Sequence, residues 1–176
     1  MSTGIAEPAV SLSEAQAFVR IETGEEEALL AAMVRSASAI CEAFTNQVVV
    51  ERDFTLGMPA KGQWTRLPLT PVKSITTVEA LGIDGSATLL DPSAYMIDID
   101  GDGDGWVRTT ADPGTSRIRV SGRAGIASHQ NDVPEPIRHG ILRLVAHLFE
   151  SRDDNGGDPP AAVTALWRPY RRMRLA

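Results

Sequence analysis

The chain has 176 residues, a formal net charge of −6, 43% hydrophobic residues and 23% charged residues, which is the balance of a soluble globular protein. A single cysteine, Cys41, excludes an internal disulfide. The opening MSTGIAEPAV has neither the basic nor the apolar region of a signal peptide, and the longest apolar runs, such as LVAHLF, are too short to span a bilayer. We therefore expect one domain over residues 1–176, with no membrane partner.

Residues 11–46 are predicted to be helical. Ser11 and Glu14 have the spacing of a capping box, which starts a short helix ending near Arg20. Thr23 and Glu26 repeat that spacing before a longer helix. Spacings of three and four predict its apolar face to be Leu29, Met33, Ala37, Ile40, Cys41 and Phe44.

Residues 47–125 are predicted to form a small antiparallel β subdomain. Short segments rich in β-branched residues are separated by glycines and prolines at hairpin spacing, and Thr70-Pro71 indicates a turn. The expected strands cover residues 48–56, 64–69, 72–81, 94–99, 105–110 and 117–122.

Residues 132–152 are predicted to be a helix capped by Asp132, and a C-terminal arm follows over residues 160–176. The arm should contain a short helix that Pro169 stops at Arg168. A run of strands between helices indicates an α+β fold rather than alternating β-α-β units. The expected apolar face of the long helix is Ile137, Ile141, Leu144, Val145 and Leu148.

The charge is unevenly placed, with six aspartates and no Lys or Arg between Asp84 and Val107. The densest part is DIDGDGDGW. Asp98, Asp100 and Asp102 match the first three ligand positions of an EF-hand loop, but Thr109 stands where a bidentate Glu is needed. Residues 98–104, with Asp104 as the fourth acid, are therefore either a solvated turn or the site of a calcium-dependent binding module.

The C-terminal arm is basic and aromatic. Trp, Tyr and Arg dominate the energetics of protein interfaces, and the same residue types can stack on nucleic acid. Four arginines on a chain of net negative charge are too few to form the basic surface that nucleic-acid binding usually requires. A packed Trp followed by a frayed basic end is the other interpretation. The candidate interface residues are Leu166, Trp167, Arg168, Tyr170, Arg171 and Arg172, with Arg174 beyond them.

No catalytic constellation is recognisable. There is no G-x-S-x-G nucleophile elbow. His139 and His147 are eight residues apart on one predicted helix, too far to share a metal ion from that helix alone. We expect neither an enzyme nor a cofactor.

The order of these segments resembles the head–tail connector, or adaptor, proteins of long-tailed bacteriophages and gene transfer agents. The resemblance runs from about Ser11 to Arg172. It rests on SLSEAQAFVRI, EEEALLAAMVRSASAICEAFTNQ, RLPLTPVKSITTVEAL, LLDPSAYMID, RIRVSGRAG, DVPEPIRHGILRLVAHLFESR and ALWRPYRR, in that order. Each segment alone is a packing or turn pattern, so their order carries the resemblance.

The resemblance implies a structural component of a virion or phage-like particle, assembled in the bacterial cytoplasm. Such proteins form a ring, usually of twelve copies, below the portal protein, and offer a platform to the head-closure or tail-side protein. DNA passes through the ring without specific binding. By position, residues 162–174 would reach the portal, with Trp167, Tyr170, Arg171 and Arg172 as anchors. The acidic loop at Asp98–Asp104 is more acidic than in a generic member of the family, so the resemblance implies no role for it. Our own hypothesis is that copies of the loop in a ring face the channel or the rim, with a basic partner surface as the alternative.

Overall fold

The structure is a computed structural model that describes residues 2–3, 7–21, 26–110, 116–151 and 158–173. The fold is α+β, as predicted. The chain divides into two compact units, which we call the β unit (residues 1–6 and 51–126) and the helical unit (residues 7–50 and 127–176).

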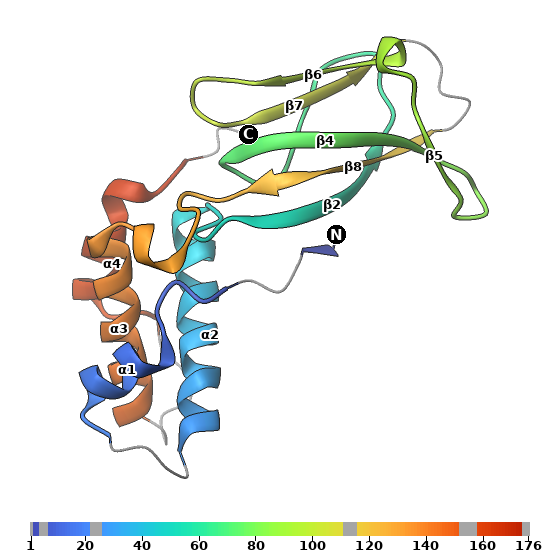
Figure 1. Ribbon diagram of the computed structural model, residues 1–176. Helices are drawn as coiled ribbons and strands as arrows, with labels where there is room; N and C mark the ends of the chain where they lie inside the picture. The colour runs from blue at the N-terminus through green and yellow to red at the C-terminus, as the bar shows by residue number, and fades with distance from the viewer. Residues whose placement is uncertain (1, 4–6, 22–25, 111–115, 152–157, 174–176) are drawn as a thin grey trace. The chain divides into compact units, whose positions relative to one another are not determined.

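The helical unit contains α1 (Leu12–Val19), α2 (Glu27–Thr45), α3 (Glu135–Glu150) and α4 (Ala161–Trp167), and α3 contacts each of the other three helices (Figure 1). The capping box at Ser11 is confirmed, with the Glu14 amide donating to the Ser11 hydroxyl and the Glu14 carboxylate accepting from the Ser11 amide. At α2 the N-cap position is Glu26, while the expected cap, Thr23, lies outside the described residues.

The buried face of α2 is rotated from the predicted one. Ala37 and Cys41 are buried as expected, but Leu29 is 41% exposed. An alanine-rich helix has apolar residues on several sides, so spacing alone did not fix which side packs. By length and hydropathy alone, α2 could cross a membrane. However, α2 buries one stripe of residues against its neighbours, as a helix in a packed core does. That stripe is Leu30, Val34, Ala37, Cys41 and Thr45.

α3 starts later than predicted. Asp132 is not its cap, because residues Gln130–Asp132 form a 3-10 turn (η2) and Pro134 occupies the N-cap position. A proline disfavours helical backbone in the residue before it, so Pro134 keeps Val133 extended, whereas Pro136 lies in the first turn of α3, where a missing N–H is tolerated. The buried residues of α3 are Ile137, Gly140, Ile141, Leu144 and Val145.

The β unit contains two antiparallel sheets. The larger has the order β1-β2-β8-β4-β5, and the smaller has the order β3-β7-β6. The large sheet consists of β1 (Ser2–Thr3), β2 (Arg52–Pro59), β8 (Arg117–Ala124), β4 (Val72–Leu81) and β5 (Ala87–Leu89). The small sheet consists of β3 (Thr65–Arg66), β7 (Gly105–Thr109) and β6 (Tyr95–Ile99). The sequence reading missed only the short outer strands β1 and β5.

Buried and outward-facing side chains alternate along β2 and β8, and the buried ones form the core of the β unit. Phe54 and Leu56 of β2 and Ile118 and Val120 of β8 are buried, while the residues between them face outward. Val107 of β7 is buried as well, and the small sheet contacts the large one through β4 and β6. The expected turn at Thr70-Pro71 contains a cis peptide bond and precedes β4.

The chain leaves the helical unit at Val50 and returns to it at Ala127. These two residues form an isolated parallel bridge, and the Ala127 amide donates to the Val49 carbonyl over 3.1 Å. The two connections to the β unit are therefore hydrogen-bonded to each other within the helical unit.

Candidate functional site

The acidic hairpin between β6 and β7 is organised by Asp100. One of its carboxylate oxygens accepts hydrogen bonds from the backbone amides of Asp102 and Asp104, at 3.0 and 2.9 Å. The other accepts from the indole Nε1 of Trp106 at 3.0 Å. Asp100 thus closes the turn in the way that a short carboxylate side chain commonly does.

Two further contacts anchor this loop. The Asp104 carboxylate, 14% exposed, pairs with Arg66 at 2.6 Å, and the Gly103 carbonyl accepts from the Val72 amide at 2.7 Å. The tip is therefore not the freely solvated, mobile turn that composition suggested. Asp98 and Asp102 are the exposed acids of the segment.

This geometry disfavours the calcium-loop alternative. Both oxygens of Asp100 already accept hydrogen bonds from protein donors, and Asp98 lies on a strand, outside the turn. Within the described ranges, no group of three or more His, Cys, Asp or Glu side chains is arranged to hold a metal ion. A calcium site needs six to eight converging oxygens, which this hairpin does not supply.

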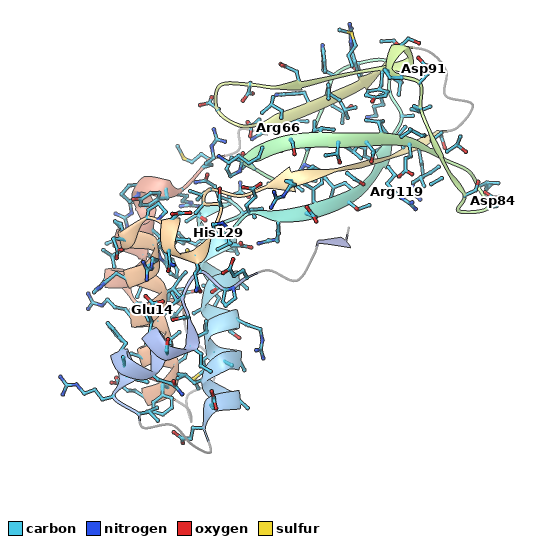
Figure 2. The ribbon with its side chains drawn as sticks, viewed as in Figure 1. Glu14, Arg66, Asp84, Asp91, Arg119 and His129 are labelled. Carbon is cyan, nitrogen blue, oxygen red and sulfur yellow. The ribbon has the colours of Figure 1, made fainter. Side chains whose placement is uncertain are left out.

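The two remaining aspartates of the acidic segment also hold turns, which Figure 2 shows at separate places on the β unit. Asp84 accepts from the amide and hydroxyl of Ser86, and Asp91 does the same with Ser93. The hydroxyl hydrogen bonds, followed by the amide ones, hold the pKa of both carboxyls below the ordinary value. The high density of aspartate is thus largely turn chemistry.

The structure corrects the placement of Trp167, which is 0% exposed and cannot serve as a surface anchor in this fold. Its indole Nε1 donates to the Ile137 carbonyl over 3.3 Å, and its ring lies 5.9 Å from that of Phe44. A Cβ added at Gly140 would come within 2.2 Å of that nitrogen. Trp167 therefore fastens α4 to α3, and the packed alternative describes it correctly.

After Trp167 the chain forms a short turn, η3 (Arg168–Tyr170), that is fixed to the end of α2. The Arg172 amide donates to the Thr45 carbonyl over 2.9 Å, and the Gln47 side chain donates to the Tyr170 carbonyl. Most of the expected interface residues are thus held in defined positions, although Arg174 lies outside the described residues.

The side chains of this turn make a basic surface. Arg168 and Arg171 are exposed, and the Arg171 guanidinium lies 5.4 Å from the centre of the Phe44 ring. Leu166, Tyr170 and Arg172 are partly exposed. We call Arg168, Tyr170, Arg171 and Arg172 the basic turn.

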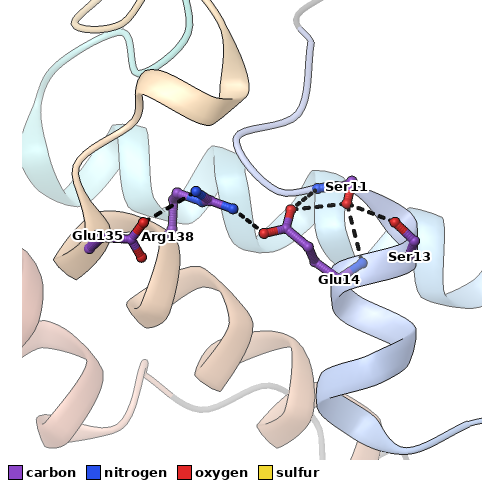
Figure 3. Close-up of polar contacts among 5 residues, drawn as sticks. All are labelled: Ser11, Ser13, Glu14, Glu135 and Arg138. Atoms are coloured by element: carbon purple, nitrogen blue, oxygen red, sulfur yellow. Dashed lines mark hydrogen bonds and ion pairs between the residues drawn. The ribbon is translucent and has the colours of Figure 1, made fainter.

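Glu14 links α1 to α3, as Figure 3 shows: its carboxylate pairs with Arg138, whose guanidinium also reaches Glu135 at 3.3 Å. Burial, the largest single influence, raises the pKa of Glu14. The hydrogen bonds from Ser11 and the charge of Arg138 together outweigh burial and hold that pKa below its ordinary value. This network is structural, since it locks two helices together.

An open cleft of about 280 Å³ lies between α1, α3 and α4. Phe18, Ala146 and Val163 give it apolar walls, and Arg143, His147 and Glu150 complete its lining. His139 packs edge-on against Phe18, with ring centres 6.1 Å apart. Among the described residues that line the cleft there is no serine, threonine or cysteine to serve as a nucleophile.

One surface was missed by the sequence analysis, namely strand β6. Met96, Ile97 and Ile99 are 44%, 42% and 37% exposed, although they lie in a regular strand. The signal was present in AYMIDI, where apolar residues stand at consecutive positions 96 and 97. A half-buried strand would alternate apolar with polar residues there.

Comparison with known proteins finds structural likeness without close sequence likeness. No protein family model matches the chain, and no curated protein sequence matches it significantly. Three solved structures of gene transfer agent particles contain chains with a similar fold. A chain in the neck of an empty particle, computed with C6 symmetry, has a TM-score of 0.77 and 22% identity, and the match covers 100% of this chain and 98% of that one.

The other two are from native particles. A chain in the virion has a TM-score of 0.78 and 22% identity, with 99% and 96% of the two chains covered. A chain in the neck, computed with C12 symmetry, has a TM-score of 0.78 and 21% identity, with 100% and 98% covered. At this identity the likeness shows a shared fold, including both units.

Proposed function

We propose that this chain is a structural component of the neck of a gene transfer agent or phage-like particle, and not an enzyme. The observation that carries the proposal is the match over the whole of both chains to a neck protein. A match confined to one common unit would be weak support for a function, because one fold hosts many functions. Here one match covers both units of the chain.

The finer proposal is an adaptor ring below the portal protein. The similar chains belong to necks computed with C6 and C12 symmetry, which favours a closed ring of twelve copies. The ring would join head to tail, bind the portal on one side and the head-closure or tail-side protein on the other, and extend the DNA channel. The protein would act in the virion after assembly in the bacterial cytoplasm.

The basic turn is the proposed portal contact. It is at least partly exposed and carries three arginines. One backbone hydrogen bond from Arg172 to Thr45 of α2 and side-chain hydrogen bonds from Asn46 and Gln47 hold it in place. A surface held in place before binding loses less conformational entropy on association. Leu166 and Trp167 contribute by holding the turn, with Trp167 in the core.

Substitutions of charge in the basic turn test this contact. Arg168→Glu/Arg171→Glu should abolish joining of the chain to portal-bearing heads, while thermal unfolding changes little. Arg35→Glu/Arg143→Glu, which reverses the charge of two exposed arginines on α2 and α3, is the matched control and should join normally. Deleting residues 166–176 is unsuitable because it removes Trp167 from the core. Normal joining by the double Glu variant would contradict the assignment of this surface.

The exposed acids Asp98 and Asp102 are the proposed channel or rim charges. Repeated around a ring, they would repel DNA phosphates and oppose the counterion-release attraction that makes DNA adhere. Asp98→Asn/Asp102→Asn should therefore slow DNA ejection or raise DNA retention, most strongly at low salt. Asp84→Asn, at a different turn of the β unit, is the control. Ejection identical to wild type at every salt concentration would leave these acids as solvated surface only.

A further inference from the structure

We propose that the outer edge of β6 in one copy pairs with the outer edge of β3 in the next copy, so that the small sheets of neighbouring subunits form one continuous sheet. The inference rests on the proposed function, which supplies a ring. A closed ring needs two different, complementary surfaces on each chain, one for each neighbour. The order β3-β7-β6 provides two edges at opposite sides of the same sheet.

The backbone of β6 is open for such pairing. The Thr110 amide donates to Ala94 and the Asp100 amide donates to Asp104, which fixes the alternation of the ladder between β6 and β7. Tyr95, Ile97 and Ile99 therefore direct their N–H and C=O groups away from β7. Among the described strands, none is hydrogen-bonded to this edge, although β4 contacts β6.

Natural edge strands prevent pairing with charged residues, above all lysine, with proline or with a bulge. Of these features the edge of β6 carries one charge, Asp98. Residues 95–99 read YMIDI, pair with β7 without a register shift, and expose Met96, Ile97 and Ile99. An open apolar edge of this kind is a template for strand addition.

Among the described strands, β7 alone is hydrogen-bonded to β3, on one side of it. The Leu67 amide donates to the Gly105 carbonyl at 2.8 Å, so Trp64 and Arg66 direct their backbone groups outward. Trp64 is 40% exposed. Since β3 and β6 both run antiparallel to β7, they run parallel to each other. A neighbour related by rotation about an axis along the strands would therefore pair in parallel.

The side-chain rows across the small sheet make the two edges complementary. Trp106 of β7 stands opposite Asp98 on β6 and opposite Arg66 on β3. If this row continues into the next copy, Asp98 lies beside the neighbour's Arg66, which already pairs with Asp104 of its own chain and has further guanidinium N–H groups for a second acid. Charge complementarity of this kind fixes register and excludes wrong partners.

The rows of side chains next to the Trp106 row also place compatible residues beside each other. Arg108 of β7 contacts Met96 on one side and lies 5.0 Å from the centre of the Trp64 ring on the other. Continuing that row places Met96 beside the neighbour's Trp64, a favourable sulfur–aromatic pair. Val107 stands opposite both Ile97 and Thr65, so continuing its row covers the exposed Ile97. A second copy of this chain is thus the occupant that the edge fits.

Disulfide trapping tests the pairing. In a Thr65→Cys/Ile97→Cys chain, the two cysteines lie on strands separated by β7, about 10 Å apart, which is too far for an intrachain disulfide. Mild oxidation of the concentrated protein should give a reducible ladder of covalent oligomers that ends in closed rings. The control is Thr65→Cys/Ile83→Cys, because Ile83 is fully exposed outside both edges. No ladder, or the same ladder from the control, would overturn the proposal.

A charge substitution gives an independent reading. Asp98→Lys should weaken self-association, measured by analytical ultracentrifugation, by at least about tenfold, because it places like charges beside the neighbour's Arg66. Asp102→Lys makes the same charge change at the hairpin tip and should not. Equal behaviour of the two would count against pairing. If the chain is incorporated into particle necks but forms no ladder of covalent oligomers, the proposed strand pairing is refuted and the proposed function stands. If the chain is incorporated into no neck, the proposed function is refuted, with or without a ladder.

Discussion

Gly140 of α3 lies against the indole of Trp167, and this contact determines how α4 sits. In Gly140→Ala the new methyl would come within 2.2 Å of Nε1 and 2.8 Å of Cε2, closer than non-bonded atoms approach. The indole must move, which also lengthens its hydrogen bond to Ile137. An overpacked core costs about 1–3 kcal/mol, and the weakened hydrogen bond about 1 kcal/mol more. Replacing a helical glycine by alanine returns about 1 kcal/mol.

The net expectation is that Gly140→Ala lowers the free energy of unfolding by about 1–3 kcal/mol, with a fall in Tm of roughly 3–10 °C. Thermal and urea unfolding followed by circular dichroism would measure it. Trp167→Phe removes the clashing nitrogen, so in that background Gly140→Ala should be nearly neutral or stabilising. Additive effects of the two substitutions, or a rise in Tm for Gly140→Ala alone, would refute this account of the contact.

Three further outcomes are expected. Glu14→Gln should lower the free energy of unfolding at pH 7 by up to about 1 kcal/mol, a small effect because the pair with Arg138 is partly exposed. Since the folded-state pKa of Glu14 is lowered, the stability difference between wild type and variant should disappear as the pH falls below about 4.3. A stability difference that stays the same at low pH would contradict this role of Glu14. Asp100→Ala should cost about 2 kcal/mol in urea unfolding, because three hydrogen bonds are lost, whereas Asp98→Ala, at an exposed position of β6, should change little. Burial raises the pKa of the Cys41 thiol, so a thiol reagent should label it only after unfolding.

Local chemistry predicted local structure well. The capping box at Ser11 depends on residues three apart, and the strands of the β unit depend on alternation and turn residues, so a short window contains what decides them. The short helix that ends before Pro169 is likewise a local effect. These features need no knowledge of what packs against them.

Features decided by distant partners were predicted poorly. Trp167 was assigned to an interface because aromatic and basic residues surround it, but Gly140, far away in the sequence, leaves the space that buries it. The packed side of α2 was predicted only in part, with Ala37 and Cys41 correct, because its alanines are compatible with several faces. Asp100 was grouped with its acidic neighbours, although its hydrogen bonds to the turn give it a different role.

The bridge between Val50 and Ala127 bears on how such a protein evolves. Nearly all of the β unit, residues 51–126, is inserted between two points of the helical unit that are hydrogen-bonded to each other. An insertion whose ends meet can be lengthened, shortened or exchanged without changing the path of the host chain. The helical unit, with its basic turn, can then be retained against one partner while the inserted unit diverges. Relatives of this chain should accordingly tolerate large changes in length between the residues equivalent to Val50 and Ala127, and few elsewhere.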